Sequence, residues 1–298
     1  MPVKVVVDSS AGLPKKIARG LDIEVVDLHM VPSEKEEESP STSGLTAIEL
    51  AALYGRLMER SRRPDAGGDG KEDGVVALHL SKELSSTWSA ATTAAGVFDD
   101  SVRLVDTGSA GMAVGAAAMS AARLAQDGAS VDECYDIAVD TLERARTWVY
   151  LDSTEELRRS GRLSTATAVF TTALLATKPI MSMQSGRPEL VGKTRTQSKA
   201  FAKLVDLVAA GAGEDPAFIA IQHNDARADA DNLRALLEDA LPSGTLFIVV
   251  PLSKVLGVHV GPGAIAVSAV YSAPPEDKPK GKQPGGFASP FGTKRAER

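Results

Sequence analysis

The stretch VVALHLSKELSSTWSAA, residues 75–91, gives the main indication of the architecture. The apolar run from Val75 to Leu80 predicts a buried strand, and the alanine-rich residues that follow predict a helix. Serine and threonine hydroxyls cluster at the turn between them, beside the first free backbone amides of the helix. Such a turn can hold a carboxylate or a phosphate. Nothing in it resembles an activated nucleophile, so the stretch favours binding an acid over cleaving a bond.

The residues around this stretch alternate between strand and helix patterns. Strands are predicted at residues 3–7, 23–30, 75–80 and 102–105. Helices are predicted between and after them, at residues 46–60, 110–126 and 131–144. Strands separated by helices indicate a parallel sheet with right-handed crossovers.

The pattern of predicted strands and helices changes after about Arg146. Short strands are predicted at residues 148–151, 178–183, 188–191, 217–222, 246–250 and 265–271, and helices at 164–176, 197–210 and 226–240. A hairpin-like turn joins the second and third of these strands, which indicates a partly antiparallel sheet. We therefore expect an α/β chain with a parallel-sheet domain (1–146), a domain with a mixed sheet (147–272) and a disordered basic tail (273–298), in which six Lys or Arg outnumber three Asp or Glu.

Composition narrows the class of protein. The 298 residues carry a net charge of -6, which argues against broad binding to nucleic acid. Cys134 is the one cysteine in the sequence, so an internal disulfide is excluded and a reducing compartment is favoured. The first residues lack the apolar core of a signal peptide, and the small-apolar stretch 109–122 is too short to span a bilayer. We expect a soluble cytoplasmic protein without stable membrane insertion.

Two common site types are not supported by the spacing of residues. Five residues separate Gly186 from the stretch Gly192-Lys193-Thr194, where a phosphate-binding loop requires four. The four histidines show no metal-ligand spacing, so we expect no metal; they are His29, His79, His223 and His259.

Two further places offer candidate ligand contacts. His259 lies in the glycine-rich stretch 256–263, which predicts an accessible connector. Thr42 and Ser43 precede a helix that Thr46 and Glu49 can already cap as a capping box, so their hydroxyls stay available.

The remaining candidates leave two interpretations open. Arg195 fits a solvated charge and a functional residue equally well. Ser85, His259 and Asp8 also permit a hydrolase, although the Gly-x-Ser-x-Gly turn of such enzymes is missing from the sequence.

Taken in order, several segments resemble the DegV family, whose fatty-acid-binding members include the FakB-type proteins. The matching segments are VDSSAGLP (7–14), TS (42–43), HLSKELSST (79–87), DTGS (106–109), LRRSGRLS (157–164), KPI (178–180), VGKTR (191–195) and VHVGPGA (258–264). Each segment alone is weak, but the ordered set spans roughly residues 3–271 and is specific. Three features depart from the family pattern. Gly44-Leu45 replaces Gln-Pro after Thr-Ser, and Ser86 replaces the glycine of Leu-Ser-Gly-Thr. A strand-and-helix segment that the family has before Thr-Ser, and that helps to cover its pocket, is shortened to the acidic loop 33–39.

The resemblance implies a two-domain DegV-like (EDD-type) fold with a ligand tunnel between the domains. It implies that one long-chain fatty acid, such as palmitate, stearate or oleate, is the ligand and that the protein is non-catalytic and needs no cofactor. Family members of the FakB type present this acid to an ATP-dependent fatty acid kinase, which makes acyl phosphate for bacterial phospholipid synthesis.

The resemblance also assigns roles to particular residues. Thr42 and Ser85 match the hydroxyls that contact the lipid carboxylate, with Ser43 and Ser86 as neighbouring candidates. Arg195 and His259 match residues near the tunnel mouth that work with the kinase. The alternatives to this carrier are a stand-alone serine hydrolase or esterase using Ser85 and His259, and a lipid-responsive sensor that signals through the basic tail.

Overall fold

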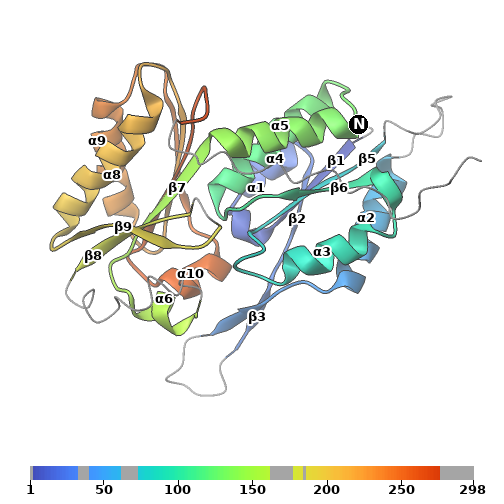
Figure 1. Cartoon of the computed structure of the whole chain (residues 1–298), viewed down its shortest axis with the longest axis horizontal. Helices are drawn as coiled ribbons and strands as arrows, with labels where there is room; N and C mark the ends of the chain where they lie inside the picture. Colours follow the sequence, from blue (N-terminus) through green and yellow to red (C-terminus); the bar gives the residue numbers. More distant parts are fainter. Residues whose placement is uncertain (1–2, 33–39, 62–72, 162–176, 184–185, 276–298) are drawn as a thin grey trace, which may run out of the picture.

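A computed structural model describes residues 3–32, 40–61, 73–161, 177–183 and 186–275. Within these ranges the chain forms two sheets, each covered by its own helices, and a two-stranded arm (Figure 1). The helix predicted at 164–176 and the tail from residue 276 onward lie outside the described residues.

The first sheet has four parallel strands in the order β2, β1, β5, β6, which confirms the predicted N-terminal parallel sheet. Its strands are β1 (Val3–Asp8), β2 (Ile23–Val26), β5 (Gly74–His79) and β6 (Val102–Asp106). The helices of this half are η1 (Ser9–Ala11), α1 (Lys15–Gly20), α2 (Ala47–Ser61), α3 (Thr87–Ala95), η2 (Asp99–Ser101), α4 (Met112–Gln126) and α5 (Val131–Arg144). Helices α4 and α5 pack on one face of the sheet, and α2 and α3 pack on the other.

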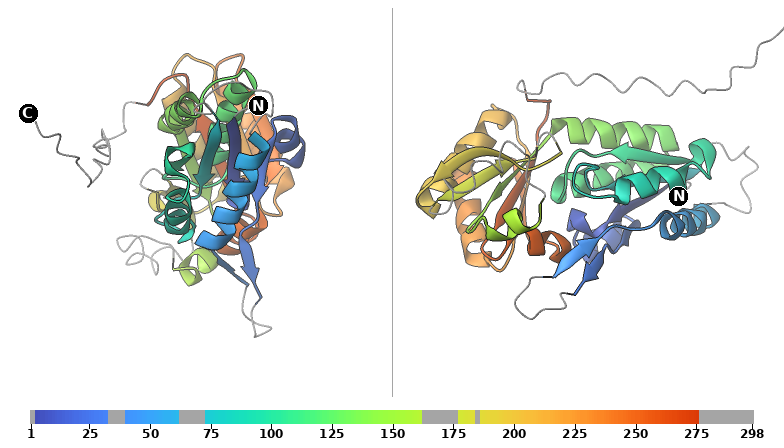
Figure 2. Two further views of the ribbon diagram at one scale, coloured as in Figure 1. Left: turned by 90° about the vertical axis from the view of Figure 1, so that its right-hand side faces the viewer. Right: turned by 60° about the horizontal axis from the view of Figure 1, so that its bottom comes forward.

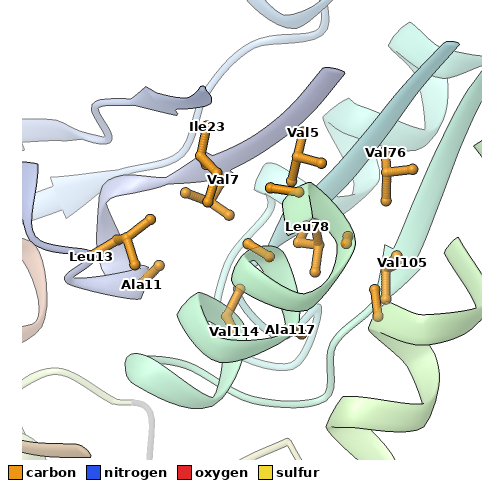
Figure 3. Close-up of a cluster of buried hydrophobic side chains, with 14 of the residues drawn as sticks. Val5, Val7, Ala11, Leu13, Ile23, Val76, Leu78, Val105, Val114 and Ala117 are labelled. Carbon is orange, nitrogen blue, oxygen red and sulfur yellow. The ribbon is translucent and has the colours of Figure 1, made fainter. Parts of the chain in front are cut away.

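Both faces of this sheet are buried, because alternate residues of each strand point to opposite helical layers. In β1, Val5 and Val7 join the core under α4 and α5, whereas Val6 joins the core under α2 and α3. Figure 3 shows the first of these cores, in which Val114 and Ala117 of α4 pack over the strands. This two-sided burial explains why the strands are continuous apolar runs in the sequence.

The second sheet has six strands in the order β11, β10, β12, β7, β8, β9. Its elements are β7 (Ala145–Tyr150), α6 (Glu155–Arg159), β8 (Lys178–Ser182), β9 (Glu189–Thr194), α8 (Gln197–Ala212), β10 (Phe218–His223), α9 (Arg227–Ala240), β11 (Leu246–Pro251), α10 (Lys254–Val260) and β12 (Ile265–Val270). Strands β10 and β11 pair in parallel and all other neighbours are antiparallel, which confirms the predicted mixed sheet. Helices α8 and α9 cover one face, where Trp148, Tyr150, Phe201 and Leu233 are buried.

The two halves are joined without a linker, because β7 begins directly after α5 ends at Arg144. The domain boundary expected after Arg146 falls inside β7, and its position stays a prediction. Along the chain β7 follows the helical layer of the first sheet and then runs as a central strand of the second (Figure 1).

The continuous strand expected at 23–30 is wrong, because the chain leaves the first sheet after Val26. The backbone N–H of Leu28 instead donates to the Ser9 hydroxyl, 3.0 Å away, and the Leu28 side chain is buried. The chain then forms β3 (His29–Val31), which pairs in antiparallel fashion with β4 (Ser41–Ser43). This arm lies beside α10 in Figure 1 and in the right-hand view of Figure 2.

Two further features of the described residues concern membrane spans and the cysteine. None of the helices formed by the described residues is long and apolar enough to cross a membrane. Cys134 lies on α5 and is fully buried, and this burial raises the pKa of its thiol to about 11. A thiol with so high a pKa is unreactive at neutral pH.

Candidate ligand-binding site

A cavity of about 290 Å³ lies between the carboxyl edge of the first sheet and the inner face of the second. Its size is close to the lower end of the roughly 300–1,000 Å³ typical of small-molecule sites. The loops that follow β5 and β6 border it on one side, and β7, β8 and β12 border it on the other. The carboxyl edge of a parallel sheet is where ligands usually bind in such folds.

The deep walls of the cavity are mostly apolar. Buried side chains from both halves of the chain form them: Leu80, Leu151, Leu157, Met181, Met183 and Leu252. Val149 of β7 and Leu151, the residue after this strand, stand at alternate positions and belong to a cluster apart from the α8–α9 core, on the side of the cavity. The inner face of this sheet therefore offers hydrocarbon surface to a ligand.

The rim of the cavity is polar. Thr42 and Ser43 reach it from β4, Ser85 and Ser86 from the turn before α3, and His259 from α10. Thr42, Ser85 and His259 are half-buried, whereas Ser43 and Ser86 are exposed. Residues that are far apart in the sequence, and that were all predicted as site candidates, are thus brought to one end of one cavity.

Thr42 and His259 are in direct contact. The Thr42 Oγ1 and His259 Nε2 atoms are 2.8 Å apart, a hydrogen-bond distance between a hydroxyl and an imidazole. Either atom can be the donor, depending on the imidazole tautomer. When Nε2 carries the proton, it donates to Thr42, and the hydroxyl proton of Thr42 is left to donate to a ligand.

The connector predicted around His259 is wrong, because His259 lies in the last turn of α10. Val255 is buried and anchors the first turn of this helix. The Asn224 side-chain amide donates to the backbone oxygens of Gly257 (3.2 Å) and Gly261 (2.7 Å), which caps the end of the helix. Gly261 stops it with a positive φ of 76°. Helix α10 therefore fixes His259 more firmly than a loop would.

Ser85 is held by the first turn of α3. Its Oγ accepts a hydrogen bond from the Thr87 backbone N–H (3.1 Å) and lies 2.9 Å from the Thr87 hydroxyl. Thr87 Oγ1 in turn accepts from the Leu45 backbone N–H at 3.2 Å. Because the bond from Thr87 N uses a lone pair of Ser85, the hydroxyl proton of Ser85 can still be donated to an anion.

Gly44 explains one departure from the family pattern. A Cβ atom at this position would lie 2.8 Å from Thr87 Oγ1, 2.9 Å from Ser86 Oγ and 3.1 Å from the Thr87 backbone nitrogen. Only glycine lets the chain after β4 approach the α3 turn this closely. The substitution therefore tightens the contact between the two hydroxyl-bearing segments.

The charge at the site is small. None of the described residues that line the cavity is Lys, Arg, Asp or Glu, so His259 is the titratable side chain among them. An anion at the rim would be held by charge-assisted hydrogen bonds from hydroxyls and the imidazole. Within the described ranges there is also no group of three or more His, Cys, Asp or Glu side chains that would hold a metal ion.

Two other predicted residues lie elsewhere. Arg195 follows β9, is exposed and is not among the residues that line the cavity. Asp8 is buried beneath the rim, where its carboxylate contacts Nδ1 of His79 at 3.3 Å. A triad of Ser85, His259 and Asp8 is therefore wrong, because the imidazole that Asp8 orients is that of His79.

One polar residue that lies deep in the cavity was not predicted from the sequence. Gln222 of β10 is fully buried, and its Oε1 accepts from the Met112 backbone N–H at 2.8 Å, across the two halves of the chain. Its Nε2 has no hydrogen-bond partner among the described residues. The available signal was a single amide inside the apolar strand FIAIQH, residues 218–223.

Comparison with known proteins gives consistent matches over nearly the whole chain. A family model described as "Uncharacterised protein, DegV family" matches residues 2–272. A DegV domain-containing protein of Corynebacterium glutamicum is 59% identical over 273 residues, which cover 91% of this chain and 95% of that protein.

Solved structures agree with this assignment. The crystal structure of a DegV family protein from Corynebacterium glutamicum has a TM-score of 0.84 and 58% identity, and the match covers 92% of this chain and 98% of that one. A DegV family protein from Thermus thermophilus, described with fatty acid binding, has a TM-score of 0.79 and 26% identity over 91% and 99% of the two chains. DegV of Bacillus subtilis, described as a fatty acid binding protein, has a TM-score of 0.75 and 27% identity over 90% and 98%.

The close approach at Gly44 predicts the effect of adding a methyl group there. Gly44→Ala should force the β4 arm away from α3 and weaken the Leu45 N–H to Thr87 hydrogen bond, at a cost of about 1–3 kcal/mol for overpacking. Urea denaturation would measure the stability, and amide hydrogen exchange would report on the Leu45 N–H.

Gly96→Ala is the matched control, because a Cβ at Gly96 meets only ordinary contacts, the nearest at 3.6 Å. Equal stability and equal Leu45 exchange in the two variants would contradict the account of Gly44.

Proposed function

The chain belongs to the DegV family, and we propose that it binds one long-chain fatty acid, such as palmitate, stearate or oleate, in the cavity between its sheets. The observation that carries this proposal is the cluster of hydroxyls and one imidazole at the half-exposed end of a mostly apolar cavity. An amphipathic ligand with an acidic head and a hydrocarbon tail complements that distribution. The fatty acid binding described for the relatives from Thermus thermophilus and Bacillus subtilis supports the proposal.

The carboxylate is placed between Thr42 and Ser85. His259 Nε2–H donates to Thr42 Oγ1, and the Thr42 hydroxyl then donates to one carboxylate oxygen. The Ser85 hydroxyl, supported by the Thr87 backbone N–H, donates to the head group as well. Hydrogen bonds to a charged group are shorter and about twice as strong as neutral ones. The head is thus held without burying a second full charge, which would be costly to desolvate.

The hydrocarbon tail supplies most of the affinity. Burial of each methylene contributes about 0.8 kcal/mol, so about ten buried methylenes contribute roughly 8 kcal/mol before the costs of ordering are subtracted. The apolar deep walls around Met181 and Leu151 receive this tail. The affinity then depends on how well the acyl chain fits the cavity, whereas the position of the carboxylate depends on the hydroxyls at the rim.

We further propose that the protein presents the bound acid to an ATP-dependent fatty acid kinase in the cytoplasm. The half-exposed rim leaves the head group accessible while the tail stays shielded from water. The kinase would transfer the γ-phosphoryl group of ATP to a carboxylate oxygen, with ADP as the leaving group, and the acyl phosphate would enter phospholipid synthesis. The DegV-family chain is then a carrier, and the phosphoryl chemistry belongs to its partner.

A stand-alone hydrolase is the competing function. It would need His259 to take a proton from Ser85, as a general base does from a nucleophile. In the structure Nε2 of His259 contacts Thr42, and the Ser85 hydroxyl is engaged by Thr87. This arrangement favours the carrier, in which both hydroxyls act as hydrogen-bond donors.

The direct test is lipid binding by the purified wild-type protein. We expect fatty acid to co-purify from a bacterial host and delipidated protein to take up added palmitate or oleate, as measured by extraction with mass spectrometry and by titration calorimetry. Protein without extractable fatty acid that also fails to take up either acid would overturn the proposal. Turnover of activated esters that is lost in Ser85→Ala would instead favour the hydrolase.

Removing either rim hydroxyl should weaken binding. Thr42→Ala and Ser85→Ala each remove a hydrogen bond to a charged group, worth about 1.5–3 kcal/mol, so Kd for palmitate should rise roughly tenfold to over a hundredfold. Ser89→Ala, an exposed position on the same helix as Thr87, is the control and should bind as the wild type does. Unchanged affinity in both rim variants would contradict the proposal that Thr42 and Ser85 bind the carboxylate.

If the protein delivers its ligand to a kinase, a substitution can slow the kinase reaction without changing the affinity for the fatty acid. Arg195 is exposed and is not among the residues that line the cavity, so Arg195→Ala should keep the wild-type Kd for palmitate but slow acyl-phosphate formation by the kinase. Formation of ADP in a mixture of kinase, ATP and palmitate-loaded protein would measure this. Lys193→Ala is the matched control, because Lys193 is also exposed and lies near the end of β9. Equal rates for both variants would contradict a role of Arg195 in delivery.

A further inference from the structure

The two segments that carry the rim hydroxyls are both hydrogen-bonded to one turn. Asp8 ends β1, and Ser9 and Ser10 follow it in the short helix η1. One side chain of this turn holds the segment that leads to Ser85, and the next holds the segment that leads to Thr42. Neither Asp8 nor Ser9 lines the cavity itself.

Asp8 fixes the segment that leads to Ser85. Its Oδ2 accepts from the Leu80 backbone N–H at 2.8 Å, and its Oδ1 accepts from the Ser10 N–H at 2.9 Å. The residue is 1% exposed. A buried carboxylate is tolerated only when hydrogen bonds satisfy it, so these contacts hold Leu80 in place. The turn that starts at Ser81 and contains Ser85 follows immediately.

His79 completes the environment of this carboxylate. Its Nδ1 lies 3.3 Å from Asp8 Oδ2, and its Nε2 lies 2.8 Å from the Tyr54 hydroxyl. A neutral imidazole satisfies every group when Nδ1–H donates to Asp8 and Nε2 accepts from Tyr54. Burial, together with the nearby Asp8 charge, raises the pKa of Tyr54, so Tyr54 remains a donor at neutral pH.

Ser9 fixes the segment that leads to Thr42. Its Oγ accepts from the Leu28 backbone N–H at 3.0 Å, at the point where the chain leaves the first sheet. The β3 strand begins at the next residue, and Met30 of β3 pairs with Thr42 of β4. The position of Thr42 therefore depends on where Leu28 is held.

The two segments meet again at α3. The Leu45 N–H, three residues after Thr42, donates to Thr87 Oγ1, and Thr87 holds Ser85. The route from Asp8 to Ser85, across Thr87 to Thr42 and back to Ser9 is a closed ring. A closed ring defines the separation of the two hydroxyls better than either segment alone, because a shift in one segment strains bonds in the other.

We propose that Asp8 and Ser9 are positioning residues for the head group: together they set the spacing of the Ser85 and Thr42 hydroxyls to fit one carboxylate. The inference deepens the proposed function and rests on it for the identity of the ligand. Without the Ser9 hydroxyl, the Leu28 N–H loses its acceptor and the β3–β4 arm loses its anchor. Hydrogen bonds weaken steeply when their distance and angle leave the preferred range, so a small displacement of the arm reduces affinity.

Ser9→Ala tests the anchor with a mild change. We expect Kd for palmitate to rise about threefold to tenfold, because the loss of one member of a hydrogen-bond network weakens the residues coupled to it by an amount of this size. Ser9→Thr keeps the hydroxyl and should restore the wild-type Kd. Ser120→Ala, which removes a hydroxyl bonded to a backbone oxygen of α4 outside the cavity, is the matched control and should leave Kd unchanged.

A double-mutant cycle separates positioning from general destabilisation. If Ser9 acts through Thr42, Ser9→Ala should have little effect on Kd in a Thr42→Ala background, although it lowers the thermal midpoint equally in both backgrounds. Additive losses of affinity in this cycle would overturn the proposal.

A lipid-free measurement keeps the inference independent of the proposed function. In protein without ligand, the ¹⁵N chemical shift of His259 Nε2 reports the Thr42–His259 contact. It should move in Ser9→Ala, in the same direction as in Thr42→Ala, and stay in place in Ser9→Thr and Ser120→Ala. An unmoved shift in Ser9→Ala overturns the positioning role even when palmitate binds, and a moved shift supports it even when palmitate does not.

Asp8→Asn extends the test to the other segment. It should move the ¹⁵N shift of His79 and weaken palmitate binding more than Ser9→Ala does, because a buried amide cannot accept all the bonds that Asp8 accepts. Wild-type affinity in a folded Asp8→Asn protein would overturn the role of Asp8. If that variant does not fold, the Ser9 measurements alone decide the outcome.

Discussion

The hydrogen bond between the Asp8 carboxylate and the Leu80 backbone N–H is the constraint on which the site depends. It joins the carboxyl ends of two neighbouring parallel strands, β1 and β5, in a place without access to water. A charge in such a place must be satisfied by the protein, so the ends of both strands are fixed in relation to each other. The turn after β5, which brings Ser85 and Ser86 to the cavity, starts from this fixed edge.

Much of the architecture follows from local sequence. The first sheet is buried on both faces, so its strands are continuous apolar runs such as Val75–Leu78 and are easily recognised. The hydroxyls of Ser85 and Thr42 stand at the ends of predicted elements, one before a helix that begins at Thr87 and one before a helix that Thr46 and Glu49 cap as expected. Local rules predict such end positions well because caps and turns depend on a few adjacent residues.

What the sequence did not predict depends on contacts between distant residues. The residues around Leu28 continue a strand pattern, but the Leu28 N–H donates to the Ser9 hydroxyl, nineteen residues earlier, where the chain leaves the sheet. Glycines around His259 indicate a loop, yet the side chain of Asn224, the residue after β10, caps a helix there. The side chain of Gln222 accepts a hydrogen bond from the Met112 N–H at the start of α4, in the opposite half of the chain. Periodicity carries no information about these long-range partners.

The absence of a cationic side chain among the described cavity residues has a consequence for the proposed delivery. An arginine at the rim would hold a carboxylate more firmly, but it would hold an acyl phosphate more firmly still, because that product carries more negative charge and matches a bidentate guanidinium. Hydroxyl donors from Thr42 and Ser85 give the product no comparable extra stabilisation. In the proposed delivery, a head-group site without Lys or Arg suits a carrier whose ligand is modified and then released, and it leaves the stabilisation of transferred charge to the proposed kinase.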